Sequence, residues 1–281
     1  MKILLTGASS DTGLKLTKKI IENLDNFGEL TLLSSSLSIS EKINANKYDK
    51  IKIINQNLLD PLQDKLKLTL NNIDVLIHIA WIRPTNPLNA INHNMEVIDK
   101  ILKNINKKTK VIFLSSISGV PNALSYYGKS KFQISKILLN NCETSVFVCG
   151  LIITDNKKTP FYFLKKLFEN SPFLIKFGSE VKILYTDSNQ VLNAINNKIN
   201  NFEKGVCGLY NNEDISLDEF AKRNFKLKQK ISINISLVIK VFLLISKYLN
   251  YVPIVNKIVD KIITIVTIDK FKIDELIKKG F

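Results

Sequence analysis

The chain has 281 residues, enough for one large domain or two small ones with a sizeable core. Its 45% hydrophobic and 23% charged residues are ordinary values for a globular protein. The net charge of +15 comes almost wholly from lysine, and no basic stripe with interleaved aromatic residues accompanies it. We therefore expect no nucleic-acid partner, while an anionic substrate stays compatible with the charge.

The cysteines, the histidines and the first residues exclude further classes. Cys142, Cys149 and Cys207 have neither metal-ligand spacing nor an even number, so we expect reduced, buried thiols. His78 and His93 are the only histidines, too few for a histidine-based metal site. The start MKILLTGASS lacks the cleavage site of a signal peptide, which indicates a strand in a cytoplasmic protein.

Short apolar runs alternate with helical patterns in the first part of the chain. Helical periodicity follows the first run and recurs near 88–105 and 124–140. This alternation is typical of right-handed βαβ units, so we expect an α/β protein with a Rossmann-type, doubly wound parallel sheet. The predicted strands are residues 2–6, 29–34, 51–55, 74–80, 110–116 and 145–150.

The regularity weakens after about residue 155. Residues 1–155 and 156–281 thus form two parts, the second smaller and mostly helical, with some of its strands and helices returning to the sheet. In it we expect helices at 159–169 and 187–199, the second capped by Asp187, strands at 181–185 and 205–211, and a buried or amphipathic helix pair within 231–268. The run LVIKVFLLIS is too short and too interrupted to span a bilayer, and weak peripheral membrane contact is the alternative.

A glycine-containing loop, TGASSDTG, follows the first strand and opens a helix, which is the context that a phosphate-binding loop needs. Gly7 permits a tight turn and Gly13 lets the helix pack closely on the strand. The helix N-terminus supplies N–H donors and positive potential for a pyrophosphate. Ser10 replaces the usual middle glycine, so a purely structural turn is the alternative.

The end of the second strand carries information on the cofactor. The chain reads Ser34-Ser35-Ser36 there, without the carboxylate that binds the ribose 2′-hydroxyl in many NAD-dependent folds. NADP is therefore the preferred cofactor. No arginine is nearby to bind a 2′-phosphate, so NAD stays open.

Tyr127 and Lys131 lie four residues apart in the predicted helix 124–140 and share one of its faces. An ammonium beside a phenol favours the phenolate, so we expect Lys131 to lower the pKa of Tyr127. Tyr126 has Ser130 at the same offset. A solvated helix face is the alternative.

Three serines, Ser115, Ser116 and Ser118, stand at the end of the fifth predicted strand, at the edge where open α/β sheets bind ligands. A hydroxyl there can polarise a substrate carbonyl beside Tyr127. The alternative is a polar loop whose hydroxyls bond the backbone.

Taken in order, these motifs resemble those of the extended short-chain dehydrogenases/reductases, in the NAD-dependent epimerase/dehydratase family that acts on nucleotide sugars. TGASSDTG is similar to T-G-x-x-G-x-x-G, VLIHIA to a strand ending H-x-A-A, NMEVIDKIL to N-v-x-G-T-x-x-L, IFLSSIS to the catalytic-serine strand and YGKSK to Y-x-x-x-K. VCGLII, KILYTDSNQVLNAI and TIDKFKIDELIKKGF resemble later segments, so the resemblance covers nearly the whole chain.

The resemblance implies a role for each matching residue. Tyr127 transfers a proton to or from the sugar oxygen, Lys131 also holds the nicotinamide ribose, and Ser116 hydrogen-bonds the reacting oxygen. Asn94 supports the lysine through water, a polar helix position being the alternative. The implied cofactor-binding residues are Gly7, Ser9, Ser10, Asp11, Thr12, Gly13, Ser34, Ser35, Asn57, Leu58, Ala80 and Lys131.

Several positions depart from the family pattern. Asn57 stands where an aspartate usually meets the adenine, Trp81 replaces a small residue, and Val148-Cys149 replace Arg-Pro. Residues 121–126 contain no carboxylate, which disfavours dehydration.

The resemblance implies an NAD(P)-dependent oxidoreductase that reduces a 4-keto sugar nucleotide in surface-polysaccharide biosynthesis, with residues 156–281 binding the substrate. A nucleotide-sugar 4-epimerase is the first alternative, and a catalytically silent dinucleotide-binding regulatory protein is the second. Members of the family commonly form homodimers, here through the helices near 88–105 and 124–140.

Overall fold

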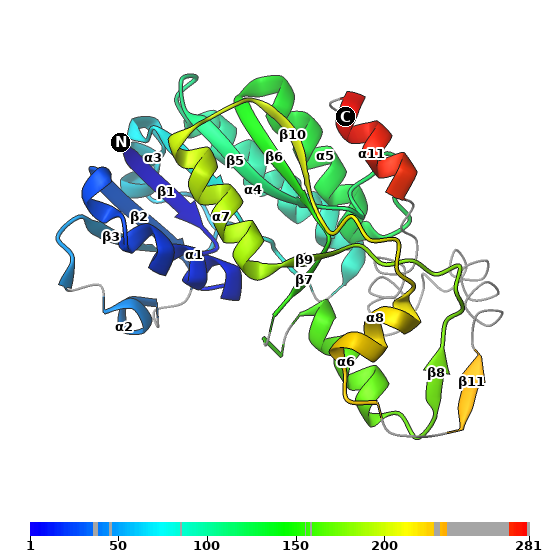
Figure 1. Cartoon of the computed structure of the whole chain (residues 1–281). Helices are drawn as coiled ribbons and strands as arrows, with labels where there is room; N and C mark the ends of the chain where they lie inside the picture. The colour runs from blue at the N-terminus through cyan, green and yellow to red at the C-terminus, as the bar shows by residue number, and fades with distance from the viewer. Residues whose placement is uncertain are drawn as a thin grey trace.

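The computed structural model describes residues 1–35, 39–44, 47–84, 86–154, 156–157, 159–227, 231–234 and 270–279. Within them, seven parallel strands form one sheet in the order β10-β6-β5-β4-β1-β2-β3 (Figure 1). The chain changes direction across the sheet between β1 and β4, which is where open α/β sheets bind ligands. The predicted Rossmann-type doubly wound fold is confirmed.

The strands of this sheet are short, apolar and buried on both faces at its centre. Their bounds are β1 Lys2–Thr6, β2 Glu29–Ser34, β3 Ile51–Asn55, β4 Val75–His78, β5 Lys110–Ser116, β6 Glu143–Cys149 and β10 Gly205–Leu209.

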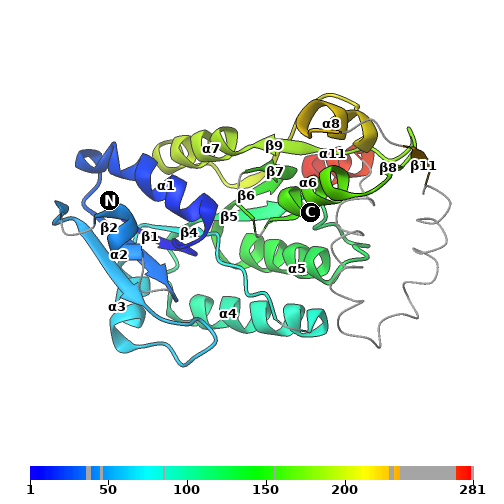
Figure 2. The ribbon, with the colours of Figure 1, turned by 90° about the horizontal axis from the view of Figure 1, so that it is seen from below.

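Helices cover both faces of the sheet (Figure 2). One face packs on α1 (Asp11–Ile21) and α7 (Ser188–Asn200). The other packs on α3 (Asp64–Asn72), α4 (Ala90–Asn104) and α5 (Tyr126–Asn141). The short α2 (Ile39–Ile43) and the 3₁₀ turns η1 (Leu24–Asn26) and η3 (Pro87–Asn89) complete this part.

A second, phenylalanine-rich core lies beyond the carboxyl edge of the sheet (Figure 1). Its helices are α6 (Pro160–Asn170) and α8 (Leu217–Asn224). Two small parallel pairs accompany it, β7 (Leu151–Ile153) with β9 (Tyr185–Asp187), and β8 (Leu174–Lys176) with β11 (Ser232–Asn234). The phenylalanines buried there are Phe161, Phe168, Phe177, Phe220 and Phe225.

Most predicted elements are present. The strands predicted at 2–6, 29–34, 51–55 and 110–116 have the observed bounds, and the one predicted at 145–150 begins earlier, at Glu143. The strand predicted at 74–80 ends at His78, because the N–H of Ala80 turns away to the hydroxyl of Thr6. The helices predicted at 88–105, 124–140, 159–169 and 187–199 are α4, α5, α6 and α7, and the strand at 205–211 is β10. Asp187 is the N-cap of α7 as predicted.

The strand predicted at 181–185 is wrong except for Tyr185, which begins β9, and the helices α2, α3, α8 and α11 were not predicted. Val181 and Ile183 are buried, but their backbone forms only an isolated bridge with the residues around the start of α8: Ile183 donates to the carbonyl of Ile215, and Leu217 donates to that of Val181. In the predicted helix pair, Ser232–Asn234 form β11, and the rest lies outside the described residues.

All three cysteines are free, but only Cys149 is buried, while Cys142 and Cys207 are half-buried. No helix in the described ranges is long and apolar enough to cross a bilayer. The same ranges hold no group of three His, Cys, Asp or Glu side chains that could bind a metal ion.

Helix α11 (Lys270–Lys279) packs against β10 at the edge of the sheet. Ile273 is 3% exposed and belongs to the core between the sheet and the helices α3, α4 and α5. The hydroxyl of Tyr210 donates to Asp274, and burial together with that carboxylate raises the pKa of Tyr210. An apolar anchor and a polar bond thus hold α11 on the sheet.

We expect Ile273→Ala to lower the free energy of unfolding by about 2 to 4 kcal/mol, since it removes a buried branched side chain and leaves a cavity. Urea unfolding measures the change. Lys278→Ala, an exposed position of the same helix, is the control and should change it by less than about 0.5 kcal/mol. Equal effects of the two substitutions would contradict the packing of α11.

Candidate active site

The glycine loop connects β1 to α1 by close backbone contacts. Gly7 has φ +72, and a Cβ on it would lie 2.7 Å from the backbone nitrogen of Ala80. A Cβ on Gly13 would lie 2.3 Å from the carbonyl oxygen of Gly7. Only glycine fits at these two positions, and together they bring β1, the end of β4 and the N-terminus of α1 to one point.

Ser10, which stands for the usual middle glycine, is the N-cap of α1. Its φ of −69 and ψ of 161 are ordinary for any residue, and its Oγ accepts from the Gly13 N–H at 3.0 Å. The N–H groups of Asp11 and Thr12 then begin the helix, where no earlier carbonyl of the helix can pair with them. The substitution leaves the anion-binding end of the helix in place.

The carboxylate of Asp11 turns toward a distant part of the chain. It accepts from the hydroxyl of Thr154, which follows β7, and pairs with Lys15 at 3.2 Å. A negative charge therefore lies in the first turn of the helix at which the sequence predicts a pyrophosphate.

The residues predicted at the adenine end lie after β2 and β3. Ser34 and Leu58 are buried, whereas Ser35 and Asn57 are exposed. Asn57 is engaged in its own turn, since its Oδ1 accepts from the N–H of Leu59 at 3.2 Å.

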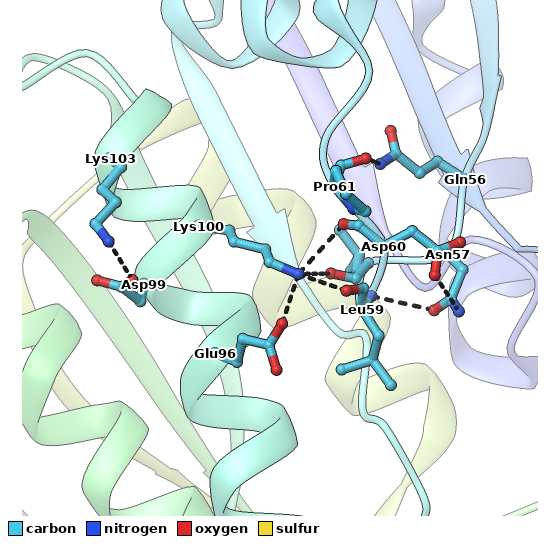
Figure 3. A network of polar contacts seen from close by, with 10 residues as sticks. Gln56, Asn57, Leu59, Asp60, Pro61, Glu96, Asp99, Lys100 and Lys103 are labelled. Atoms are coloured by element: carbon cyan, nitrogen blue, oxygen red, sulfur yellow. Dashed lines mark hydrogen bonds and ion pairs between the residues drawn. The ribbon is translucent and has the colours of Figure 1, made fainter.

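Lys100 of α4 binds the backbone of this turn (Figure 3). Its ammonium donates to the carbonyls of Leu59, at 2.5 Å, and Asp60, at 3.2 Å, and pairs with Glu96 at 2.7 Å. The loop that follows β3 is thus tied to α4, a contact that sequence reasoning missed.

The serines that end β5 point to different surroundings. Ser115 is buried and its Oγ accepts from the hydroxyl of Ser135 at 3.1 Å, beneath α5. Ser116 is half-buried, and its Oγ lies 3.1 Å from that of Ser118. Of the two strand residues, Ser116 is the accessible hydroxyl.

Gly128, which sequence reasoning did not single out, lets α5 approach the serine loop. A Cβ on Gly128 would lie 2.2 Å from the carbonyl oxygen of Ser118. The helix begins just before it, with Ser125 as the N-cap. Tyr127 therefore projects from the first turn of α5 beside the end of β5.

Lys131 is buried, with a side chain 3% exposed. Its ammonium donates to the carbonyl of Leu114 at 2.7 Å. It also lies 4.6 Å from the ring centre of Phe113, 5.1 Å from that of Trp81 and 5.9 Å from that of Tyr127. The predicted proximity of Lys131 and Tyr127 is present, and Phe113 is a neighbour that the sequence did not indicate.

Burial dominates the electrostatics around this amine. It lowers the pKa of Lys131 to about 7; Cys149 opposes the shift and Arg83 adds to it. Burial also raises the pKa of the Cys149 thiol to about 12 and lowers that of His78 to about 3. Near neutral pH, Lys131 is therefore the buried group of this cluster that changes charge.

Asn94 lies under the loop that carries Trp81. Its Oδ1 accepts from the N–H of Ile82 at 2.9 Å, and its amide donates to the carbonyls of Ile82, at 2.9 Å, and Ala90, at 2.8 Å. Both amide hydrogens are used on the backbone. The water-mediated link from Asn94 to Lys131 stays a prediction. A water in that link would have to donate to the remaining lone pair of the Asn94 Oδ1.

The glycine loop, Ser116 and the first turns of α5, with Tyr127 and Lys131, thus lie at the carboxyl edge of one parallel sheet. Comparisons with profiles of known protein families and with curated proteins gave no match. Solved structures do match. A nucleoside-diphosphate-sugar epimerase from Staphylococcus aureus is 14% identical with a TM-score of 0.67, over 99% of this chain and 96% of that one.

This chain has the fold of the extended short-chain dehydrogenases/reductases. A dTDP-glucose 4,6-dehydratase from Bacillus anthracis in complex with NAD is 11% identical, with a TM-score of 0.61 over 83% of this chain and 87% of that one. A UDP-glucose 4-epimerase from Bifidobacterium longum, in complex with NAD⁺ and UDP, is 16% identical, with a TM-score of 0.57 over 83% and 89% of the two chains.

The lowered pKa of Lys131 predicts how stability depends on pH. In the unfolded state the Lys131 amine has a pKa near 10.5, and in the native state its pKa is about 7. Between these pH values the unfolded state binds more protons than the native state, so the free energy of unfolding rises with pH. One unit of pKa shift corresponds to about 1.4 kcal/mol, so between pH 7 and 10 the free energy of unfolding of the wild type should rise by roughly 3 to 4 kcal/mol relative to that of Lys131→Met. Urea unfolding of both proteins at each pH measures the difference, and a constant difference would contradict the burial of the amine.

Proposed function

We propose that this chain is an NAD(P)-dependent oxidoreductase that acts on a nucleotide sugar, reducing a 4-keto sugar nucleotide. The observation that carries the proposal is that the Lys131 ammonium lies beside the ring of Tyr127 at the carboxyl edge of the sheet, where β5 ends at Ser116 and the glycine loop follows β1. The fold that the chain shares with nucleotide-sugar epimerases and dehydratases supports the substrate class.

The residues at the glycine loop fit a dinucleotide. Gly7 and Gly13 let the loop and the start of α1 pack closely on β1 and on the end of β4, and the N-terminus of α1 offers the N–H groups of Asp11 and Thr12 to a pyrophosphate. A bound nicotinamide dinucleotide would supply the hydride. In this proposal Lys131 holds the nicotinamide ribose, while Asn57, Leu58, Ser34 and Ser35 border the adenine end.

In the proposed reaction Tyr127 gives its phenolic proton to the sugar oxygen as a general acid, and takes it back in the reverse direction. Ser116 donates a hydrogen bond to the same oxygen and so orients it. The Lys131 ammonium, close to the ring of Tyr127, favours the phenolate that remains after proton transfer.

Epimerisation at C4 is the second candidate, because it needs the same three side chains and because several proteins of this fold are 4-epimerases. The serines after β2 favour NADP, and a reductase that releases its oxidised cofactor agrees with that choice. NAD is the alternative, since it is bound in two of the solved structures of this fold. In the same proposal, residues 156–281 bind the sugar nucleotide and the chain forms a homodimer through the outer faces of α4 and α5.

We expect Tyr127→Phe to lower kcat by at least about 100-fold while NADPH binding changes little, because only the hydroxyl is removed. Purified protein would be incubated with candidate 4-keto sugar nucleotides and each reduced cofactor, and products identified by mass spectrometry. Net reduction supports the reductase, whereas C4 inversion without net cofactor oxidation supports the epimerase.

Tyr126→Phe is the matched control, because Tyr126 precedes it on the same helix and its ring faces the exposed Lys129. It should keep wild-type turnover. Failure to bind either dinucleotide would overturn the proposed function, and full activity in Tyr127→Phe would assign the chemistry elsewhere.

Asp11→Asn should tighten dinucleotide binding roughly threefold at low ionic strength, because it removes a negative charge from the first turn of α1. Fluorescence titration of NADPH measures the dissociation constant. Asp25→Asn makes the same change in net charge beyond the other end of α1 and should leave the constant unaltered. Equal constants for Asp11→Asn and the wild type would contradict a pyrophosphate at this helix end.

A further inference from the structure

Trp81 contacts both members of the pair on which the proposed chemistry depends. Its ring meets that of Tyr127 edge-on, with the ring centres 4.9 Å apart. The Lys131 ammonium lies 5.1 Å from the centre of the same ring. The indole therefore bridges the phenol and the amine from outside α5, and it reaches them from the loop that follows β4.

The loop that carries Trp81 is held in place by partly buried hydrogen bonds. Asn94 brackets the next residue, Ile82, by accepting from its N–H and donating to its carbonyl, both at 2.9 Å. The preceding residue, Ala80, donates to the hydroxyl of Thr6 and lies against Gly7. Hydrogen bonds thus fix the backbone on both sides of Trp81, at Ala80 and at Ile82.

A buried amine needs compensation for lost hydration, and aromatic faces supply part of it. Lys131 has one carbonyl, that of Leu114, and the rings of Phe113, Tyr127 and Trp81. Phe113 belongs to β5 and Tyr127 to α5, whereas Trp81 lies in the loop after β4. Three different parts of the fold therefore each place one aromatic ring around the Lys131 ammonium.

We propose that Trp81 is a positioning residue for the proposed reaction. Its indole keeps the Lys131 ammonium and the Tyr127 ring in a fixed position relative to each other. The proposal rests on the proposed function for its effect on turnover. Its structural part, the contact between indole and ammonium, can be measured without any substrate. Trp81 is the only tryptophan in the chain, so intrinsic tryptophan emission reports on the surroundings of this indole alone.

The first test follows tryptophan emission from about pH 5.5 to 9. The titratable and charged groups around Lys131 are His78, Cys149, Arg83 and Tyr127. His78 stays neutral and Cys149 stays a thiol over this range. We expect one transition with a midpoint near pH 7 that is lost in Lys131→Met, which retains Tyr127. Emission that does not change with pH, or that changes equally in Lys131→Met, would overturn the contact.

The second test compares Trp81→Phe, which keeps an aromatic face, with Trp81→Leu, which keeps only apolar bulk. We expect kcat to fall about tenfold or more in Trp81→Leu, to recover largely in Trp81→Phe, and KM for the dinucleotide to change less than about threefold in both. Tyr126→Leu removes the ring that faces exposed Lys129 and should leave kcat unaltered. Thermal unfolding shows whether each variant is folded, and Trp81→Phe serves if Trp81→Leu is not.

The outcomes separate the two proposals. Loss of activity in Tyr127→Phe with equal turnover in Trp81→Leu and Trp81→Phe would keep the proposed function and overturn the positioning role. If no substrate is turned over, the pH transition of the wild type and its loss in Lys131→Met still decide whether the indole holds the amine.

Discussion

The site is organised around one buried cation, the ammonium of Lys131. Out of water, an amine loses hydration that few protein groups replace, and here it keeps one carbonyl at 2.7 Å and the faces of Phe113, Trp81 and Tyr127. The replacement is incomplete, so the pKa of Lys131 falls to about 7. The positive charge of Lys131 is therefore present only in part near neutral pH, and the aromatic rings around it favour its retention.

Close backbone approaches bring the other elements to that cation. Gly7 and Gly13 let β1, α1 and the end of β4 meet at one point, and Gly128 lets α5 reach the carbonyl of Ser118. None of these positions can carry a Cβ without moving backbone atoms. The substitution of Ser10 for a glycine is of another kind, because its backbone is ordinary and its hydroxyl caps α1. The backbone geometry thus requires glycine at Gly7 and Gly13, whereas at the position of Ser10 it accepts other residues.

Much of the fold could be predicted because buried parallel strands are short apolar runs and their helices are strongly periodic. The sheet, α1, α4, α5, α6 and α7 follow from these patterns. Most of the strand expected at 181–185 is absent, because the buried apolar residues Val181 and Ile183 pair only through an isolated bridge at the start of α8 and not through a continuous ladder. Helices α3 and α8 were not predicted, because α3 has only two buried residues and α8 only three, and the rest of both helices is largely polar.

The sequence by itself determined the pairing of Tyr127 with Lys131, since an offset of four residues on one helix fixes a common face. It also determined the glycine loop and the serine strand end, because these are local in the chain. Only the tertiary structure decided which serine is accessible, that Asp11 reaches Thr154, and that Trp81 and Phe113 enclose the amine. These contacts join residues far apart in the chain, and the packing of strands and helices around a common edge, which no local pattern encodes, brings them together.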